Sequence, residues 1–131
     1  MIKMIIGGAF QGKTAFAKER FGLSDEEIID GEICDHNAAI KAKCVKNFHA
    51  LVRRIVEENG NVSEYVGRLC RENPNAVIVT NEIGSGIIPI EKSERIWREQ
   101  AGKAGCIIAK KSELVVRVYC GIPEVIKGEL R

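Results

Sequence analysis

The chain has 131 residues, which is enough for one domain with a hydrophobic core and too few for a second. Its charges nearly cancel to a formal +2, and no run of like charge is long enough to follow a nucleic-acid backbone, so no nucleic-acid partner is expected. No apolar stretch reaches the roughly 18 residues of a membrane span and no charged-then-apolar leader is seen, so we expect a cytoplasmic protein.

A glycine loop follows the first predicted strand. Residues 1–6 are an apolar run, and Gly7-Gly8-Ala9-Phe10-Gln11-Gly12-Lys13-Thr14 comes directly after it. In such a G-x-x-x-x-G-K-T loop the backbone amides surround a polyphosphate, the lysine reaches the terminal phosphates and the threonine hydroxyl ligates Mg²⁺. The sequence therefore predicts a nucleoside triphosphate site with a catalytic Lys13 and Thr14 at the metal. A glycine-rich turn without a ligand is the less favoured interpretation.

A short helix and a brief strand are predicted next. Residues 15–21 lead into Gly22, a typical helix stop, and residues 27–31 follow a turn and resemble a strand. This strand ends on Asp30, whose carboxylate is a candidate metal ligand, although a turn cap is an equally open role. Residues 34–46 have apolar side chains on all sides, and we assign them no buried face.

Two amphipathic helices are predicted in the middle of the chain. The first, around residues 48–56, has apolar residues at helical spacing on one side and charged residues on the other, and Asn59-Gly60 ends it. In the second, Asn61 and Glu64 resemble a capping box, and Pro74 lies just beyond the helix end.

The last third contains two predicted strands around one helix. Residues 76–80 are a β-branched run typical of a strand buried on both faces, and polar residues follow at its end, where α/β sheets bind ligands. A helix with Trp97 on its apolar face comes next, and residues 113–121 are expected to be the last strand. The five cysteines lack paired spacings, so we expect reduced core cysteines rather than a zinc site or disulfides.

These elements predict an α/β fold, namely a P-loop NTPase-like three-layer domain with a small, mostly parallel sheet over residues 1–131. The strand, glycine loop and helix, together with Val-Thr-Asn-Glu-Ile-Gly-Ser-Gly-Ile-Ile-Pro at residues 79–89, resemble the bifunctional adenosylcobinamide kinase and adenosylcobinamide-phosphate guanylyltransferase family. The likeness covers about half of the chain: the N-terminal region and residues 76–122.

The resemblance implies a function in cobalamin biosynthesis. Members phosphorylate the aminopropanol hydroxyl of adenosylcobinamide with a nucleoside triphosphate and then attach GMP to that phosphate. It implies Mg²⁺, ATP or GTP, and a corrinoid substrate, and members form propeller-like trimers, so a homotrimer is expected. It also favours Glu82 as a catalytic carboxylate, with a cap of the following turn as the alternative.

Two arginines and two histidines complete the candidate residues. Arg95 and Arg98 lie three apart on one predicted helix face, where they could clamp a phosphate or a GTP, or pair with neighbouring glutamates. The family's guanylylated histidine lies in a middle region that this chain mostly lacks. Of the two histidines, His36 beside Asp35 is the better candidate nucleophile, and His49 is expected to pack on its helix.

The sequence departs from the family pattern in two other respects. The chain is shorter than the family members between the glycine loop and residue 76, which argues against a competent guanylyltransferase and favours the kinase step. An Asn-Gln pair typical of the family is replaced by Gly105-Cys106, so substrate recognition can differ. Two other functions stay open: a P-loop kinase for another small alcohol, and a nucleotide-binding regulator without turnover.

Overall fold

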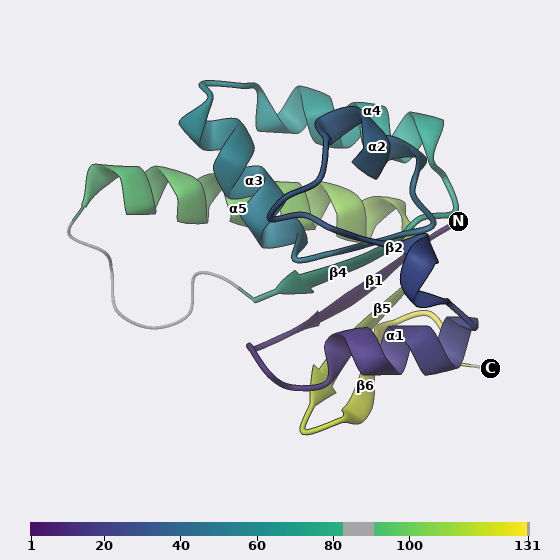
Figure 1. The fold of residues 1–131 in the computed structure, drawn as a ribbon. Coiled ribbons are helices and arrows are strands. Elements are labelled where there is room, and N and C mark those ends of the chain that lie inside the picture. The colour runs from purple at the N-terminus through teal and green to yellow at the C-terminus, as the bar shows by residue number, and fades with distance from the viewer. Residues whose placement is uncertain (83–90, 131) are drawn as a thin grey trace.

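The computed structural model describes residues 1–82 and 91–130 and is built around a six-stranded sheet (Figure 1). The strands are β1 (Ile2–Gly7), β2 (Ile28–Asp30), β3 (Cys44–Lys46), β4 (Val77–Asn81), β5 (Ser112–Tyr119) and β6 (Ile122–Lys127). Their order is β2-β3-β4-β1-β5-β6, and every neighbouring pair is parallel except β5 and β6. The predicted mostly parallel α/β sheet is therefore confirmed.

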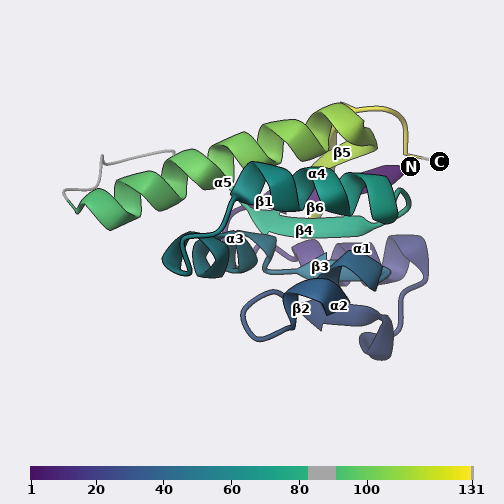
Figure 2. The same cartoon turned by 90° about the horizontal axis from the view of Figure 1, so that it is seen from above.

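Helices cover both faces of this sheet (Figures 1 and 2). The α-helices are α1 (Lys13–Phe21), α2 (His36–Lys41), α3 (Phe48–Glu57), α4 (Val62–Glu72) and α5 (Lys92–Lys111), and a short 3₁₀ helix spans Asp25–Glu27. Among the described elements, α1 packs on one face and α2 to α5 pack on the other. This arrangement is the predicted three-layer architecture.

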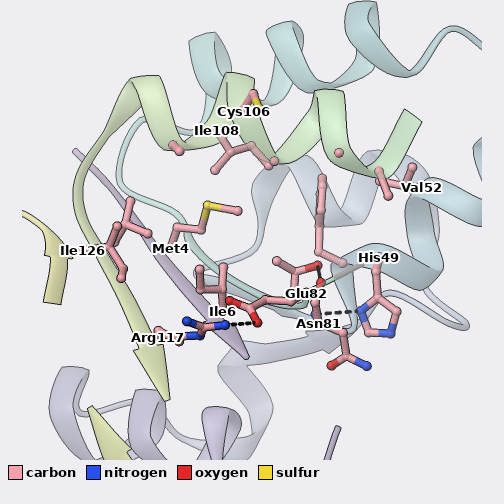
Figure 3. Close-up of a pocket in the computed structure, with 17 residues that line it drawn as sticks. Met4, Ile6, His49, Val52, Asn81, Glu82, Cys106, Ile108, Arg117 and Ile126 are labelled. Atoms are coloured by element: carbon pink, nitrogen blue, oxygen red, sulfur yellow. Dashed lines mark hydrogen bonds and ion pairs between the residues drawn. The ribbon is translucent and has the colours of Figure 1, made fainter. Parts of the chain in front are cut away.

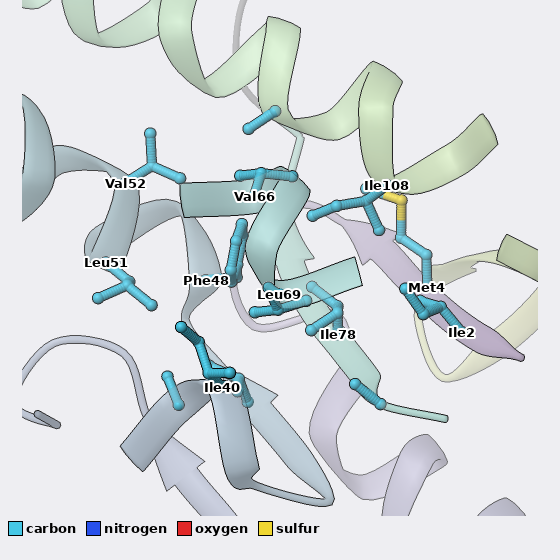
Figure 4. Close-up of a cluster of buried hydrophobic side chains, with 14 of the residues drawn as sticks. Ile2, Met4, Ile40, Phe48, Leu51, Val52, Val66, Leu69, Ile78 and Ile108 are labelled. Carbon is cyan, nitrogen blue, oxygen red and sulfur yellow. The ribbon is translucent and has the colours of Figure 1, made fainter. Parts of the chain in front are cut away.

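The alternation of side chains along the strands builds two separate cores. In β1, Ile2 and Met4 face the larger cluster under α3 to α5, whereas Ile5 faces the cluster under α1 (Figure 4). In β4, Ile78 and Val79 divide in the same way. Both faces of these central strands are thus buried, which explains their continuous apolar sequences.

The predicted helix boundaries agree with the local capping contacts. The Asn61 side chain accepts a hydrogen bond from the Glu64 amide at 3.0 Å at the start of α4. At the end of α1, Gly22 adopts the left-handed conformation with φ +63°. Asp35 caps α2, a helix whose boundaries the sequence did not predict, by accepting from the Ala38 amide at 3.3 Å.

The structure adds two strands that the sequence did not indicate. β3 lies between β2 and β4, and it falls within residues 34–46, where the apolar residues follow no single period. β6 is exposed along its whole length and pairs antiparallel with β5. The strand expected at residues 113–121 is confirmed as β5, but it is not the last one, because β6 follows it and carries no pattern of buried residues.

Some sequence expectations concern residues outside the described part or are only partly met. The glycine motif at residues 84–89 lies outside the described residues. All five cysteines are free, with Cys34 and Cys44 buried and Cys106 and Cys120 exposed, so a core position holds for only some of them. In the described part of the chain, no helix combines the length and apolarity needed to cross a membrane.

Candidate functional site

The glycine loop connects β1 to α1 at the edge of the sheet where the parallel strands end. Gly7 is confined because a Cβ there would lie 2.5 Å from the Val118 carbonyl oxygen. Gly12, which precedes α1, has φ +86°, a conformation that side chains disfavour. Phe10 also has a positive φ, of 60°, and its side chain is fully exposed. Gly7 and Gly12 therefore occupy loop positions where a side chain is disfavoured.

The β5–β6 turn supports this loop from the side. The Gln11 side-chain oxygen accepts a hydrogen bond from the Cys120 amide at 2.7 Å, and the Gln11 carbonyl accepts one from the Gly121 amide at 2.9 Å. Both bonds join segments more than 100 residues apart in sequence. The strand that the sequence did not indicate, β6, thus helps to position the predicted nucleotide loop.

Lys13 is the first residue of α1 and is buried, with an exposed fraction of 8%. Its Nζ donates a hydrogen bond to the Gly8 carbonyl oxygen at 2.5 Å, so the side chain folds back across the loop. Burial lowers the pKa of Lys13, and the negative charge of Glu82 opposes that shift. A buried ammonium group gains from an anionic partner, which a phosphate would provide.

Glu82 follows β4 directly and lies beside the first residue of the loop. Its backbone amide donates to the Gly7 carbonyl oxygen at 2.9 Å, and its Oε2 pairs with Nη2 of Arg117 at 2.8 Å (Figure 3). Arg117 comes from β5, where it is the register partner of Ile6 on β1. The sequence predicted Glu82 but not Arg117, because no local pattern links the two positions.

A cavity of about 510 Å³ opens beside Glu82, between the sheet and α5 (Figure 3). Its walls are largely apolar: Met4 and Ile6 from β1 and Val52 from α3 face Cys106 and Ile108 of α5. Polar groups gather at the end of the cavity where the strands end, with His49, Asn81, Glu82 and Arg117 among them. Such a combination of apolar walls and a few convergent polar groups is typical of small-molecule sites.

His49 lies in this cavity wall, on the first turn of α3. Its Nδ1 accepts a hydrogen bond from the Asn81 backbone amide at 3.1 Å, and its carbonyl accepts one from Trp97 Nε1 at 3.1 Å. Burial lowers the pKa of His49, and the positive charge of Lys13 adds to that shift. The imidazole is therefore held neutral with its proton on Nε2 and its Nδ1 lone pair occupied.

His36, the histidine predicted as a nucleophile, lies elsewhere, at the start of α2. Its Nε2 is 2.8 Å from Oε2 of Glu58, and its ring packs edge-on against Tyr65, whose hydroxyl donates to the His36 carbonyl at 2.6 Å. Within the described residues, His36 is not part of the wall of the cavity. The sequence interpretation thus favoured the histidine farther from Glu82.

Asp30 lies at the end of β2, separated from β1 by β3 and β4 in the sheet. Its Oδ1 accepts hydrogen bonds from Asn47 Nδ2 at 3.0 Å and from the Glu32 amide at 2.9 Å. Burial raises the pKa of Asp30, but these two bonds together with nearby positive charge, mainly that of Lys46, leave the pKa below its usual value. Asp30 is thus an ionised carboxylate that already has hydrogen-bond partners. The other predicted metal ligand, Thr14, follows Lys13 on α1 beside the loop.

Arg95 and Arg98 lie in the first two turns of α5, which extend past the strand ends (Figures 1 and 2). The part of α5 that forms the cavity wall in the described structure begins later, at Ala101. Two of the neighbouring glutamates pair with other cations, Glu94 with Arg53 and Glu99 with Lys103. The described contacts therefore bring Arg117, rather than these two arginines, next to Glu82.

Comparison with known proteins identifies the family. A family model described as cobinamide kinase / cobinamide phosphate guanyltransferase matches residues 34–126, a range that includes β3 to β5 and the cavity residues His49, Glu82 and Arg117. The matched range begins after the glycine loop. No curated protein matches the chain. Because the matched range covers well over half of its length, the chain belongs to the cobinamide kinase / cobinamide phosphate guanyltransferase family.

Proposed function

We propose that this protein transfers the terminal phosphoryl group of ATP or GTP to the aminopropanol hydroxyl of adenosylcobinamide. Family membership supports a transferase function in cobalamin biosynthesis. The observation that carries the kinase step is the position of Glu82, whose amide donates to the Gly7 carbonyl and whose side chain lines the same cavity as Gly8, the residue that accepts a hydrogen bond from Lys13. Lys13, which would bind phosphate, and the Glu82 carboxylate thus both lie at the glycine loop, where we place the contact between the nucleotide and the acceptor.

The chain's own groups are suited to an in-line phosphoryl transfer. Loop amides would hold the β- and γ-phosphates, and Lys13 would exchange its contact with the Gly8 carbonyl for a phosphate oxygen. The acceptor oxygen then bonds to the γ-phosphorus, and the bond to the bridging oxygen breaks with its electron pair leaving on the nucleoside diphosphate. Glu82 would take up the hydroxyl proton and pass it to solvent.

The oxygen donors near the loop fit Mg²⁺. The Thr14 hydroxyl is a hard ligand of the kind that Mg²⁺ accepts, and the Glu82 carboxylate could accept a hydrogen bond from a water on the ion while staying available for the hydroxyl proton. The described residues contain no cluster of three or more His, Cys, Asp or Glu side chains that could hold a metal ion. Bound Mg²⁺ would neutralise phosphate charge. We favour Glu82 over Asp30 beside the metal, because β3 and β4 separate Asp30 from the loop strand.

The apolar cavity is the proposed site for the acceptor arm that carries the hydroxyl. A volume of about 510 Å³ suits a small ligand or one arm of a larger one, and the cavity leads to Glu82. Gly105 and Cys106 contribute to its wall and have no side-chain amide to offer a ligand. The cavity therefore selects an arm mainly by shape and apolar contact.

A subsequent transfer of GMP has weaker support from the histidines. A histidine nucleophile needs a free nitrogen lone pair close to the nucleotide. His49 borders the cavity, but its Nδ1 is occupied by the Asn81 amide and its Nε2 carries the proton. His36 pairs with Glu58 away from that wall. The kinase step is therefore the better supported half of the family's chemistry.

The test is transfer of radiolabel from γ-labelled ATP or GTP to adenosylcobinamide in the presence of Mg²⁺, with Lys13→Ala as the control. We expect labelled corrinoid with the wild type and none with the variant. Label transferred only to another small alcohol would indicate a different kinase of this fold. Nucleotide binding without transfer to any acceptor would indicate a regulator, and both outcomes would refute the proposal.

A further inference from the structure

Arg117 occupies the boundary between two cavities. The first is the apolar cavity under α5. The second has a volume of about 480 Å³ and lies against the glycine loop, where Gly7, Gly8 and Gln11 contribute to its wall. Of the described residues, Glu82 and Arg117 alone line both cavities. Their ion pair therefore forms the partition between the loop side and the acceptor side.

The position of Arg117 follows from the sheet. It stands near the end of β5, with Ile6 of β1 as its register partner on one side and Glu124 of β6 on the other. Ile6 is the last side chain before the glycines, so a guanidinium at this register lies beside the start of the loop. Only the addition of β6 next to β5 places Glu124 opposite it.

The ion pair that holds Arg117 is weak enough to exchange. The side chains of Arg117 and Glu82 are 49% and 31% exposed, so water screens their attraction, and such pairs contribute little to stability. A phosphoryl group offers a guanidinium several anionic oxygens and a bidentate geometry. A phosphate that arrives between the cavities can therefore replace Glu82 as the partner of Arg117.

We propose that Arg117 contacts the phosphoryl group during its transfer, and that this contact replaces the Arg117–Glu82 ion pair. The proposal rests on the proposed function, since it assumes a nucleotide γ-phosphate at the glycine loop. A phosphoryl group that moves from the glycine loop to the acceptor must pass the Arg117–Glu82 ion pair. The Arg117 guanidinium would then neutralise negative charge on the phosphoryl oxygens in the transition state. Release from Arg117 also leaves Glu82 free to accept the hydroxyl proton.

The test compares triphosphate with diphosphate affinity, which needs no acceptor. Lys13 would contact the β-phosphate, which triphosphates and diphosphates both have, or the γ-phosphate. Arg117 would contact the γ-phosphate alone, which only the triphosphates have. We expect Arg117→Ala to weaken binding of ATP and GTP by about ten-fold, the effect of one charge-assisted hydrogen bond. Binding of ADP and GDP should change by less than about two-fold, within the spread of an ordinary surface substitution.

Arg68→Ala is the matched control, because Arg68 also pairs with one glutamate, Glu72, and its side chain is 44% exposed. It should leave all four affinities unchanged. Equal weakening of triphosphate and diphosphate binding, or no weakening, would overturn the proposal. If Arg117→Ala does not fold, Arg117→Gln carries the same comparison. A wild type that prefers triphosphate but never labels adenosylcobinamide refutes the proposed function alone, whereas one that binds no nucleotide refutes both.

Discussion

The imidazole of His49 accepts a hydrogen bond from the backbone amide of Asn81 at 3.1 Å, and so connects the first turn of α3 to the last residue of β4. This bond requires an unprotonated Nδ1. Asn81 directly precedes Glu82, so the position of the candidate catalytic carboxylate depends on the protonation state of a histidine that lies 32 residues before Asn81.

Protonation of His49 should therefore destabilise the fold. Burial holds the pKa of His49 below its ordinary value of 6.5, whereas the unfolded chain titrates near that value. Above pH 6.5 neither state takes up this proton. As the pH falls below 6.5, the unfolded state binds it first, and the free energy of unfolding decreases until the pH passes the folded pKa.

Thermal unfolding at pH 7.5, 6.5 and 5.5 measures this effect, with His49→Asn as the comparison. An asparagine oxygen can still accept from the Asn81 amide but does not titrate in this range. The variant should lose less stability than the wild type between pH 7.5 and 5.5. Parallel losses in the two proteins would show that His49 is not the group responsible.

Incubation with α-labelled GTP should leave no covalent GMP on the protein. Of the two histidines, His49 has no free lone pair in the cavity, and His36 lies against Glu58 outside the described wall. The protein should be separated from free GTP under alkaline conditions, because a bond from histidine nitrogen to phosphorus breaks in acid and any covalent label would otherwise be lost. Label that disappears in His36→Asn or in His49→Asn would contradict this prediction and identify the nucleophile.

Gly7 and Gly8 should tolerate alanine very differently. A Cβ on Gly7 would lie 2.5 Å from the Val118 carbonyl oxygen, a backbone atom that cannot turn away, whereas a Cβ on Gly8 would find its nearest neighbour at 3.6 Å. We expect Gly7→Ala to lower the free energy of unfolding by about 1–3 kcal/mol, the usual cost of overpacking. Gly8→Ala should stay within about 0.5 kcal/mol of the wild type. Chemical denaturation of both variants is the measurement, and equal losses would contradict the close approach of β5 to Gly7 at the end of β1.

The features that could be predicted from sequence are those with local causes. The glycine loop, the Asn61 cap of α4 and the apolar face of α3 each depend on residues within a few positions of one another. The β-branched run of β4 is similarly explicit, because a central strand buried on both faces has few polar residues.

The roles of His49 and Arg117 depend instead on contacts between distant segments. The sequence places α3 after an unassigned stretch, which says nothing about where the helix begins. Because β3 is a parallel strand of the sheet, α3 begins at the edge where the strands end, and this brings His49 to Asn81. Likewise, the pairing of Arg117 with Glu82 depends on the order β4-β1-β5, which no short motif specifies. The sequence favoured His36 for a local reason, its neighbour Asp35, and no local pattern shows that His49 is the histidine that borders the cavity.

A larger side chain at position 106 should weaken binding of the acceptor and leave binding of the nucleotide unchanged. Cys106 lies on the α5 side of the apolar cavity, and in the described structure it is absent from the wall next to the glycine loop. Cys106→Phe would fill part of the cavity and exclude part of the acceptor. We therefore expect the KM for adenosylcobinamide to rise by about ten-fold, the usual effect of a small change in the shape of an apolar pocket. The KM for the nucleotide should not change. Lys103→Phe adds the same ring to an exposed position of α5 that is not part of the described wall, and it should alter neither constant. A rise in both KM values with Cys106→Phe would mean that nucleotide and acceptor share this cavity, and the division into a loop side and an acceptor side would then be wrong.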